Sequence, residues 1–284
     1  MQGVGNDFVL VDEADAPMGM DWNALARQVC TRRFQIGADG LLVAGRSAAD
    51  ADLSMRMFNP DGSEDMCGNG LRCMALWAHR AGWTGTACFA VATKEGPRRV
   101  EILDTGDAQG LVRVGMGLPH FAPADIPFLG TSHLPDANNQ VLHYPLNVDG
   151  ETYSIAAVNT GSTHTVIFGD APSEETFQRV SPLIETHALF PERTSVLWAT
   201  VAGLGSIHVR IWERGAGETW GCGTGACAVG VLARVLSLVP DGPVDVVSKG
   251  GTLRIGWPGA GQEIQMTGPA QIAFEGDIEI NAAG

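Results

Sequence analysis

The chain carries one cysteine–glycine turn twice, as Met66-Cys67-Gly68-Asn69-Gly70 and as Gly221-Cys222-Gly223-Thr224-Gly225, and each copy runs directly into an apolar helical pattern. Cys67 and Cys222 therefore stand at the first turn of a helix, where the positive end of the helix dipole lowers the pKa of a thiol. The glycines leave unpaired backbone N–H groups open to an anion such as an amino-acid carboxylate. The duplication predicts two thiols that face one substrate.

The halves that contain these turns also correspond over a longer stretch. Residues 5–10 match residues 161–168 as a glycine-polar turn that enters an apolar strand, and residues 58–64 lead to Cys67 much as residues 212–218 lead to Cys222. Matching polar residues at matching offsets predict a pseudo-twofold molecule with one cleft between its halves. A chain of 284 residues is long enough for two such domains.

Short apolar runs bounded by Gly, Pro, Asp and Asn predict strands in both halves. These runs are residues 8–11, 53–58, 100–103, 111–114, 165–168, 207–212, 244–247 and 253–255. Longer periodic patterns predict helices over residues 22–32, 71–80, 174–187 and 226–238. Residues 119–145 are rich in Pro, Asp, Asn and His, as is typical of a crossover, so we place the boundary between the halves near Gly117.

Composition excludes several classes of partner. The net charge is −14 and no block of Lys and Arg occurs, which disfavours a nucleic-acid partner or an anionic membrane surface. The N-terminus has no basic region followed by an apolar core, and no stretch approaches the ~18 apolar residues of a membrane span. We therefore expect a cytoplasmic protein with no membrane partner, in which the six cysteines are free thiols.

The paired thiols suit one kind of chemistry. Inversion of an amino-acid α-carbon requires removal of a proton from one face and delivery to the other, so two acid–base groups must stand on opposing walls. Cys67 and Cys222 are the candidate pair, and helix N-termini would stabilise the enolate-like charge. Glu213, at the end of an apolar strand, can hold a proton for Cys222, and His164, at the start of another, can do so for Cys67. For each residue taken by itself, an ordinary structural role is the more common explanation.

A lone buried cysteine is usually a core residue, and the duplication of the turn is what favours a functional role here.

The spacing of the cysteines argues against a zinc site. Cys67 with Cys73, and Cys222 with Cys227, lack Cys-x-x-Cys spacing. Steps of six or five residues at about 100° each do not place both sulfurs on one helix face. We expect no metal.

Cofactor sites are disfavoured as well. Residues 221–226 match a dinucleotide fingerprint in form, but they do not follow directly from a strand, and the lysine of a phosphate-binding loop is absent. Lysine occurs only at Lys94 and Lys249, and Lys249 lies in a glycine-flanked turn, so a pyridoxal Schiff base has little support. We expect no cofactor.

At these motifs the chain closely resembles the diaminopimelate epimerase family, the cofactor-independent isomerases of bacterial lysine and cell-wall precursor synthesis. The resemblance covers nearly the whole chain. It rests on ordered motifs at residues 5–8, 37–40, 58–64, 66–73, 190–193 and 213–225.

The resemblance implies an α/β fold of two pseudo-symmetric domains, each a curved, barrel-like sheet around a central helix. Residues 1–116 would form the first domain, completed by a C-terminal strand at 273–284, and residues 117–272 the second. The resemblance also implies interconversion of LL- and meso-2,6-diaminopimelate and a homodimer. Because family members usually carry a strand before Gly3, it implies either an internal or misassigned start at Met1 or a first sheet without its edge.

The resemblance further assigns roles to individual residues. Cys67 and Cys222 would be the two bases, with His164 and Glu213 as their respective proton-handling partners. Backbone N–H groups would hold the reacting carboxylate, and four side chains would contact the substrate, Arg214 through a bidentate carboxylate contact. The N–H groups belong to Gly68, Asn69, Gly223 and Thr224, and the side chains to Asn6, Asn59, Glu213 and Arg214.

Two positions depart from the family pattern. Ser162 and Ser195 stand where members usually carry asparagines that recognise the distal centre of the substrate, and a serine hydroxyl is shorter than a carboxamide. A racemase for another polar amino acid, such as histidine, is therefore the alternative, whereas Asn69 argues against the proline-type relatives. A non-enzymatic module that holds an anion at two helix N-termini would need no second thiol.

Overall fold

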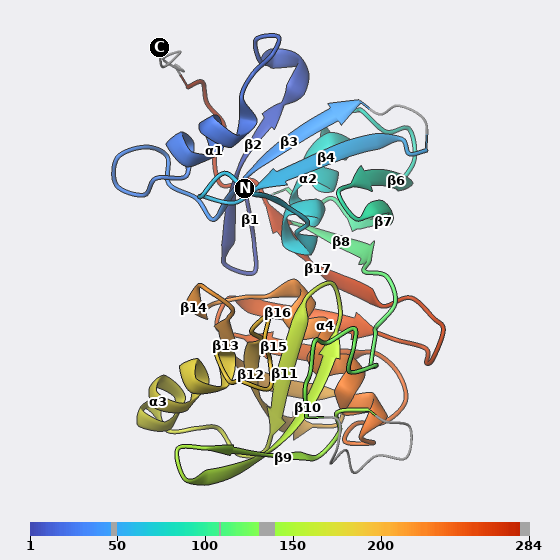
Figure 1. Cartoon of the computed structure of the whole chain (residues 1–284). Coiled ribbons are helices and arrows are strands. Elements are labelled where there is room, and N and C mark those ends of the chain that lie inside the picture. Colours follow the sequence, from blue (N-terminus) through green and yellow to red (C-terminus); the bar gives the residue numbers. More distant parts are fainter. Residues whose placement is uncertain (47–49, 108, 131–139, 279–284) are drawn as a thin grey trace.

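The computed structural model describes residues 1–46, 50–107, 109–130 and 140–278, and its elements follow an order that occurs twice along the chain (Figure 1). In each half, two strands that pair in parallel flank an outer helix. A hairpin and a short third strand then lead into a central helix, and three strands come after it. The first half comprises β1 (Gln2–Gly3), β2 (Asn6–Asp12), the 3-10 helix η1 (Glu13–Asp15), α1 (Trp22–Val29), β3 (Gly40–Arg46), β4 (Leu53–Phe58), β5 (Glu64–Asp65), α2 (Gly68–Arg80), β6 (Cys88–Thr93), β7 (Gly96–Asp104) and β8 (Gln109–Gly115).

The second half repeats this order after a longer connection. Within the predicted crossover, His120 forms an isolated bridge to Asn159, and residues 131–139 lie outside the described residues. The elements are β9 (Tyr144–Val148), β10 (Glu151–Asn159), β11 (Thr163–Phe168), α3 (Glu174–Glu185), β12 (Ser195–Gly203), β13 (Ser206–Glu213), β14 (Gly217–Thr219), α4 (Gly223–Val235), β15 (Val244–Ser248), β16 (Gly251–Gly256) and β17 (Gln265–Gln271).

Strand pairing follows the same repeat. β2 pairs in parallel with β3, as β11 does with β12, and β4 pairs in parallel with β6, as β13 does with β15. The other steps within each unit are antiparallel, including the β6–β7–β8 meander and its counterpart β15–β16–β17. The predicted pseudo-twofold relationship therefore extends to the sheet topology.

The central helices α2 and α4 are enclosed by their sheets. α2 contacts β1, β2, β3, β4, β7, β8 and β17, and α4 contacts β10, β11, β12, β15 and β16. By contrast, α1 contacts β3 and β4, and α3 contacts β9, β12 and β13, from the outside of each half (Figure 1). This arrangement confirms the predicted α/β class, with a curved sheet wrapped around a central helix. No helix in the described part of the chain is both long and apolar enough to span a membrane.

Small residues let each central helix approach its sheet. A Cβ atom added at Gly70 would lie 2.7 Å from Cδ2 of Leu42 on β3, and one added at Gly225 would lie 2.8 Å from Cδ2 of Leu197 on β12. Such separations are too short for carbon atoms, so a larger residue would push the first turn away from the sheet. The third residue after each turn cysteine is therefore glycine for the same packing reason in both halves.

Strands β8 and β17, corresponding members of the two halves, join them. They pair antiparallel from Gln109 with Gln271 to Gly115 with Gln265, and β17 also pairs with β1. The returning strand was expected at 273–284, but residues 273–278 form no strand, and residues 279–284 lie outside the described residues. We propose that the two domains divide near Gly117 and meet at the β8–β17 seam.

The predicted elements agree with the structure except at their ends. Each predicted strand lies inside an observed one. The helices predicted at 71–80 and 226–238 begin earlier, at Gly68 and Gly223, while those predicted at 22–32 and 174–187 end earlier, at Val29 and Glu185. The earlier starts place both turn cysteines directly at helix N-termini.

Candidate active site

A cleft of about 900 Å³ lies between the halves, where the N-termini of α2 and α4 approach each other. A Cβ atom added at Gly223 would lie 3.3 Å from Oδ1 of Asn69, so the two first turns are close neighbours. Three of the predicted site residues, His164, Ser195 and Arg214, do not line this cleft. The others do: Asn6, Asn59, Cys67, Gly68, Asn69, Ser162, Glu213, Cys222, Gly223 and Thr224.

Cys67 forms the first wall as the N-cap residue of α2. Its backbone is extended, and its Sγ accepts a hydrogen bond of 3.5 Å from the N–H of Gly70. The thiol in turn donates to Oδ1 of Asn6 over 3.6 Å, and the same oxygen accepts from Nδ2 of Asn69 at 3.3 Å. A sulfur in this position takes the place of the serine or aspartate oxygen that usually caps a helix.

Cys222 forms the second wall in the same way, as the N-cap residue of α4. Its Sγ accepts from the N–H of Gly225 at 3.3 Å and lies 3.4 Å from Oγ1 of Thr224. The carboxylate of Glu213, at the end of β13, also interacts with this thiol and accepts a hydrogen bond from the hydroxyl of Thr219. Thr219 was not singled out from the sequence, because its contact with Glu213 depends on the β13–β14 hairpin.

The surroundings of the two thiols differ electrostatically. Burial raises the pKa of Cys67, while hydrogen bonds from Gly70 and Asn69 and the positive charge of Arg72 oppose that rise. Burial raises the pKa of Cys222 well above its ordinary value, and the nearby Glu213 carboxylate raises it further. Burial also raises the pKa of Glu213, which makes its carboxylate a stronger base than an exposed glutamate.

His164 lies behind the cleft on β11 and is fully buried. Its Nε2 is 3.0 Å from the hydroxyl of Ser162, which is 3.4 Å from that of Thr224, and its Nδ1 has no hydrogen-bond partner among the described residues. Burial, followed by the positive charge of Arg214, lowers the pKa of His164 to about 3, so the ring is neutral. Ser162 and Thr224 thus link His164 toward Cys222, and its predicted partnership with Cys67 stays a prediction.

Ser195 and Arg214 are held beside this histidine and outside the cleft. Ser195 on β12 pairs directly with His164 in the parallel register of β11 and β12. Its hydroxyl accepts from the backbone N–H of Arg214 at 3.1 Å, and the Arg214 guanidinium donates to the carbonyl of Glu192 at 3.0 Å. Their predicted contact with substrate stays a prediction.

The arrangement combines an anion site with two proton-transfer groups. The first N–H groups of α2 and α4 have no carbonyl partner four residues back, and both helix N-termini point toward the same cleft. A carboxylate placed between them would have a thiol on either side. Within the described ranges, no cluster of three or more His, Cys, Asp or Glu side chains is arranged to hold a metal ion.

Comparison with known proteins gives a consistent assignment. The family model described as diaminopimelate epimerase matches residues 1–122 and 156–273. The protein named diaminopimelate epimerase from Desulforudis audaxviator is 44% identical over 277 residues, which cover 97% of this chain and 96% of the relative. The protein of the same name from Moorella thermoacetica is 41% identical over 282 residues, covering 99% and 98%.

Solved structures with much lower sequence identity share the fold. A probable proline racemase from Agrobacterium radiobacter has a TM-score of 0.66 at 14% identity and covers 96% of this chain and 92% of its own. A phenazine biosynthesis protein of the PhzF family from Bacillus anthracis has a TM-score of 0.65 at 16% identity and covers 95% and 92%. At this level of identity the likeness concerns the fold alone.

Proposed function

The chain belongs to the diaminopimelate epimerase family, and we propose on this premise that it interconverts LL- and meso-2,6-diaminopimelate through two thiols and without a cofactor. As a member of this family it is an isomerase. One observation carries the mechanism: Cys67 and Cys222 cap corresponding helices, and both line one cleft.

The reaction is a pair of proton transfers at the α-carbon. One thiolate removes the α-proton and becomes a thiol, and the electron pair of the C–H bond moves into the carboxylate as enolate-like charge. The other thiol then donates its proton to the opposite face of the carbon and becomes a thiolate. The two cysteines have exchanged protonation states, and the reverse reaction restores them.

The helix N-termini stabilise the charge that develops between these steps. Backbone N–H groups of Gly68, Asn69, Gly223 and Thr224 would hold the carboxylate, supported by the position of all four residues at the cleft. Asn6 and Asn59 would contact other polar groups of the substrate from the first half.

Two further residues would handle the thiol protons. Glu213 is the partner of Cys222, supported by the interaction of its carboxylate with that thiol. We propose that the halves close around the substrate and exclude water. On closure His164, which burial keeps neutral, would reach Cys67, and Arg214 would reach the distal carboxylate of the substrate.

We further propose that the enzyme works in lysine and cell-wall precursor synthesis as a cytoplasmic homodimer. Free thiols at both helix N-termini fit a reducing compartment. Light scattering of the purified protein tests the oligomeric state, and a monomer mass would refute the dimer.

The test of the function is α-proton exchange in D₂O, followed by NMR on the reduced protein. LL-diaminopimelate, L-histidine and a panel of small L-amino acids are offered separately. Deuterium incorporation with appearance of the meso isomer supports the proposal, and no exchange with LL-diaminopimelate refutes it. The Cys88→Ala variant is the matched control, because Cys88 is an exposed thiol outside the cleft.

One observation favours a second candidate, a racemase for another polar amino acid. Ser162 lines the cleft where the family usually carries an asparagine, and its hydroxyl is engaged with His164. Exchange restricted to L-histidine or another panel member would retain the two-thiol reaction and replace the substrate.

A further inference from the structure

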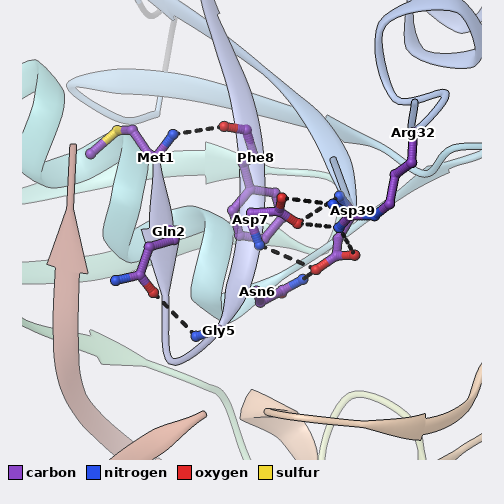
Figure 2. A network of polar contacts seen from close by, with 8 residues as sticks. All are labelled: Met1, Gln2, Gly5, Asn6, Asp7, Phe8, Arg32 and Asp39. Atoms are coloured by element: carbon purple, nitrogen blue, oxygen red, sulfur yellow. Dashed lines mark hydrogen bonds and ion pairs between the residues drawn. The ribbon is translucent and has the colours of Figure 1, made fainter. Parts of the chain in front are cut away.

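A polar network at the edge of the cleft fixes the orientation of the Asn6 amide (Figure 2). Nδ2 of Asn6 donates to Oδ2 of Asp39 over 2.7 Å. An ionised carboxylate only accepts hydrogen bonds, so the NH₂ group of Asn6 must face Asp39 and its oxygen must face the other way. The sequence presented Asp39 only as part of a family motif, because it lies 33 residues from Asn6 along the chain.

Asp39 is itself held in place from two sides. Arg32 donates from Nη2 to Oδ1 of Asp39 at 2.9 Å and also pairs with the carboxylate of Asp7. The backbone N–H of Asp7 donates to Oδ2 of Asp39, and the N–H of Asp39 donates to Oδ1 of Asp7, both over 3.2 Å. Figure 2 shows these contacts as one cross-link between the start of β2 and the segment before β3. Charge-assisted bonds of this kind resist rotation of the Asp39 carboxylate.

The orientation of Asn6 determines what Cys67 meets. With its NH₂ group on Asp39, Asn6 presents Oδ1 to the Cys67 thiol at 3.6 Å and to Nδ2 of Asn69 at 3.3 Å. An oxygen acceptor stabilises the S–H form of a cysteine and disfavours the thiolate, whereas an N–H donor would do the opposite. Asn69 is oriented in turn: its Oδ1 is buried without a partner among the described residues and lies near Gly223 of α4.

Among the described residues of the second half, the corresponding positions form no such network. By strand register and sequence, Asn6 corresponds to Ser162 and Asp39 to Thr194, whose hydroxyl bonds within the core to Oγ1 of Thr165 and to backbone carbonyls. Cys222 instead has the carboxylate of Glu213 beside it. The two thiols are therefore equivalent in the backbone and different in the side chains that act on their protons.

We propose that Asp39, anchored by Arg32, is a positioning residue that fixes the direction of the Asn6 hydrogen bonds and thereby holds Cys67 in its S–H form between turnovers. The inference rests on the proposed two-thiol reaction for its catalytic meaning, because Cys67 must carry its proton whenever it is the cysteine that delivers one to the α-carbon. Two other charges act on this thiol: Arg72 on α2 favours the thiolate, and Glu213 on β13 disfavours it.

The test measures alkylation of each cysteine by iodoacetamide against pH in the reduced, full-length protein, with peptide mass spectrometry to separate Cys67 from Cys222. In Asp39→Asn the new amide can donate as well as accept, so Asn6 can turn its NH₂ group to the sulfur. We expect the alkylation midpoint of Cys67 to move about one pH unit lower and that of Cys222 to stay. An unchanged midpoint at Cys67, or equal shifts at both cysteines, would overturn the proposal.

Three further variants keep the test decisive. Asn6→Ser copies the side chain of the second half and leaves the Arg32–Asp39 pair intact; it should lower the Cys67 midpoint by itself, and adding Asp39→Asn should then cause no further shift. A further shift in the double variant would mean that Asp39 does not act through Asn6. Asp245→Asn, which removes a bidentate pair with Arg254 away from the cleft, is the matched control and should leave the midpoint unchanged. Because alkylation needs no substrate, absence of exchange with LL-diaminopimelate would refute the proposed function without affecting this result.

Discussion

Cys67 and Cys222 occupy the same position in two corresponding helices: each is the N-cap residue, and the sulfur of each accepts the backbone N–H of the residue three positions later. A thiol in this position has two functions, since it caps the N-terminus of a helix and faces the cleft.

Replacement of either cysteine by serine should remove proton transfer and keep the helix cap. Serine is a good N-cap residue, so the midpoint of thermal unfolding should change little in Cys67→Ser and Cys222→Ser. A hydroxyl is a much weaker acid than a thiol, so turnover should fall by about 10²–10⁴-fold in each variant. Epimerisation assays with circular dichroism melts check both. Near-normal turnover in either variant would contradict the two-base assignment.

Neutralising Glu213 should make Cys222 easier to ionise while it lowers turnover. The carboxylate raises the pKa of the Cys222 thiol, so Glu213→Gln should move the alkylation midpoint of Cys222 to lower pH. Turnover should fall because the variant lacks a base beside the thiol. Alkylation against pH and steady-state kinetics measure the two effects. Glu101→Gln, at an ion pair with Arg113 outside the cleft, is the control. An upward shift of the Cys222 midpoint in Glu213→Gln would contradict the prediction.

The neutral, buried His164 should make the protein sensitive to acid. Its pKa in the folded state is about 3, against 6.5 for the free group. Between these values the unfolded chain binds a proton that the folded chain does not. The free energy of unfolding should therefore fall, as pH falls through this window, by about 1.4 kcal/mol per pH unit from this group.

His164→Asn lacks this titration, so urea unfolding at several pH values should give it a flatter pH dependence than the wild type. His208→Asn, on the exposed side of β13, controls for the loss of a histidine. Parallel pH curves for wild type and His164→Asn would count against a neutral His164.

Contact of the β1–β2 turn with the second half should depend on Gly250. A Cβ atom added there would lie 1.9 Å from the carbonyl oxygen of Val4 and 2.9 Å from that of Trp220, and both are backbone atoms. Gly250→Ala should therefore lower the free energy of unfolding by about 3 kcal/mol. Gly85→Ala, where a Cβ meets nothing within 4 Å, should be close to neutral. Denaturant titrations compare the two, and equal stabilities would contradict the packing argument.

Many helices and strands could be predicted from the sequence because the repeat consists of local residue patterns. The two turns and the strands that follow apolar runs each depend on neighbouring residues. The periodic patterns begin at Leu71 and Ala226, later than the observed starts at Gly68 and Gly223, because glycines are weak helix formers; here the first turns are held by the thiol caps and by packing against Leu42 and Leu197.

The family resemblance implied a last strand at 273–284, and the last strand in the described part of the chain is β17 at Gln265–Gln271. β17 contains Gly268 and Pro269, two residue types that are uncommon inside strands. A side chain at position 268 would meet Leu253 and the buried Arg72, so the glycine there serves packing.

For the candidate site as well, residues in local motifs could be proposed from the sequence, whereas contacts between distant residues could not. Cys67 and Cys222 were proposed from the repeated motif, and the substrate-contacting residues from the family resemblance. The roles of Asp39 and Thr219 were not, because Asp39 depends on the parallel pairing of β2 and β3, and Thr219 on the hairpin of β13 and β14.

At the β8–β17 seam two equivalent strands join two corresponding halves, and this duplication suits a reaction that must proceed in both directions. Inversion of one carbon gives a product with the same set of bonds as the reactant. The two therefore differ little in free energy, and the direction of net reaction follows their concentrations. An enzyme for such a reaction must lower the barrier from either side. A scaffold made of two related halves places a thiol-capped helix on each face of the substrate carbon, so a thiol is available for proton removal in both directions of the reaction.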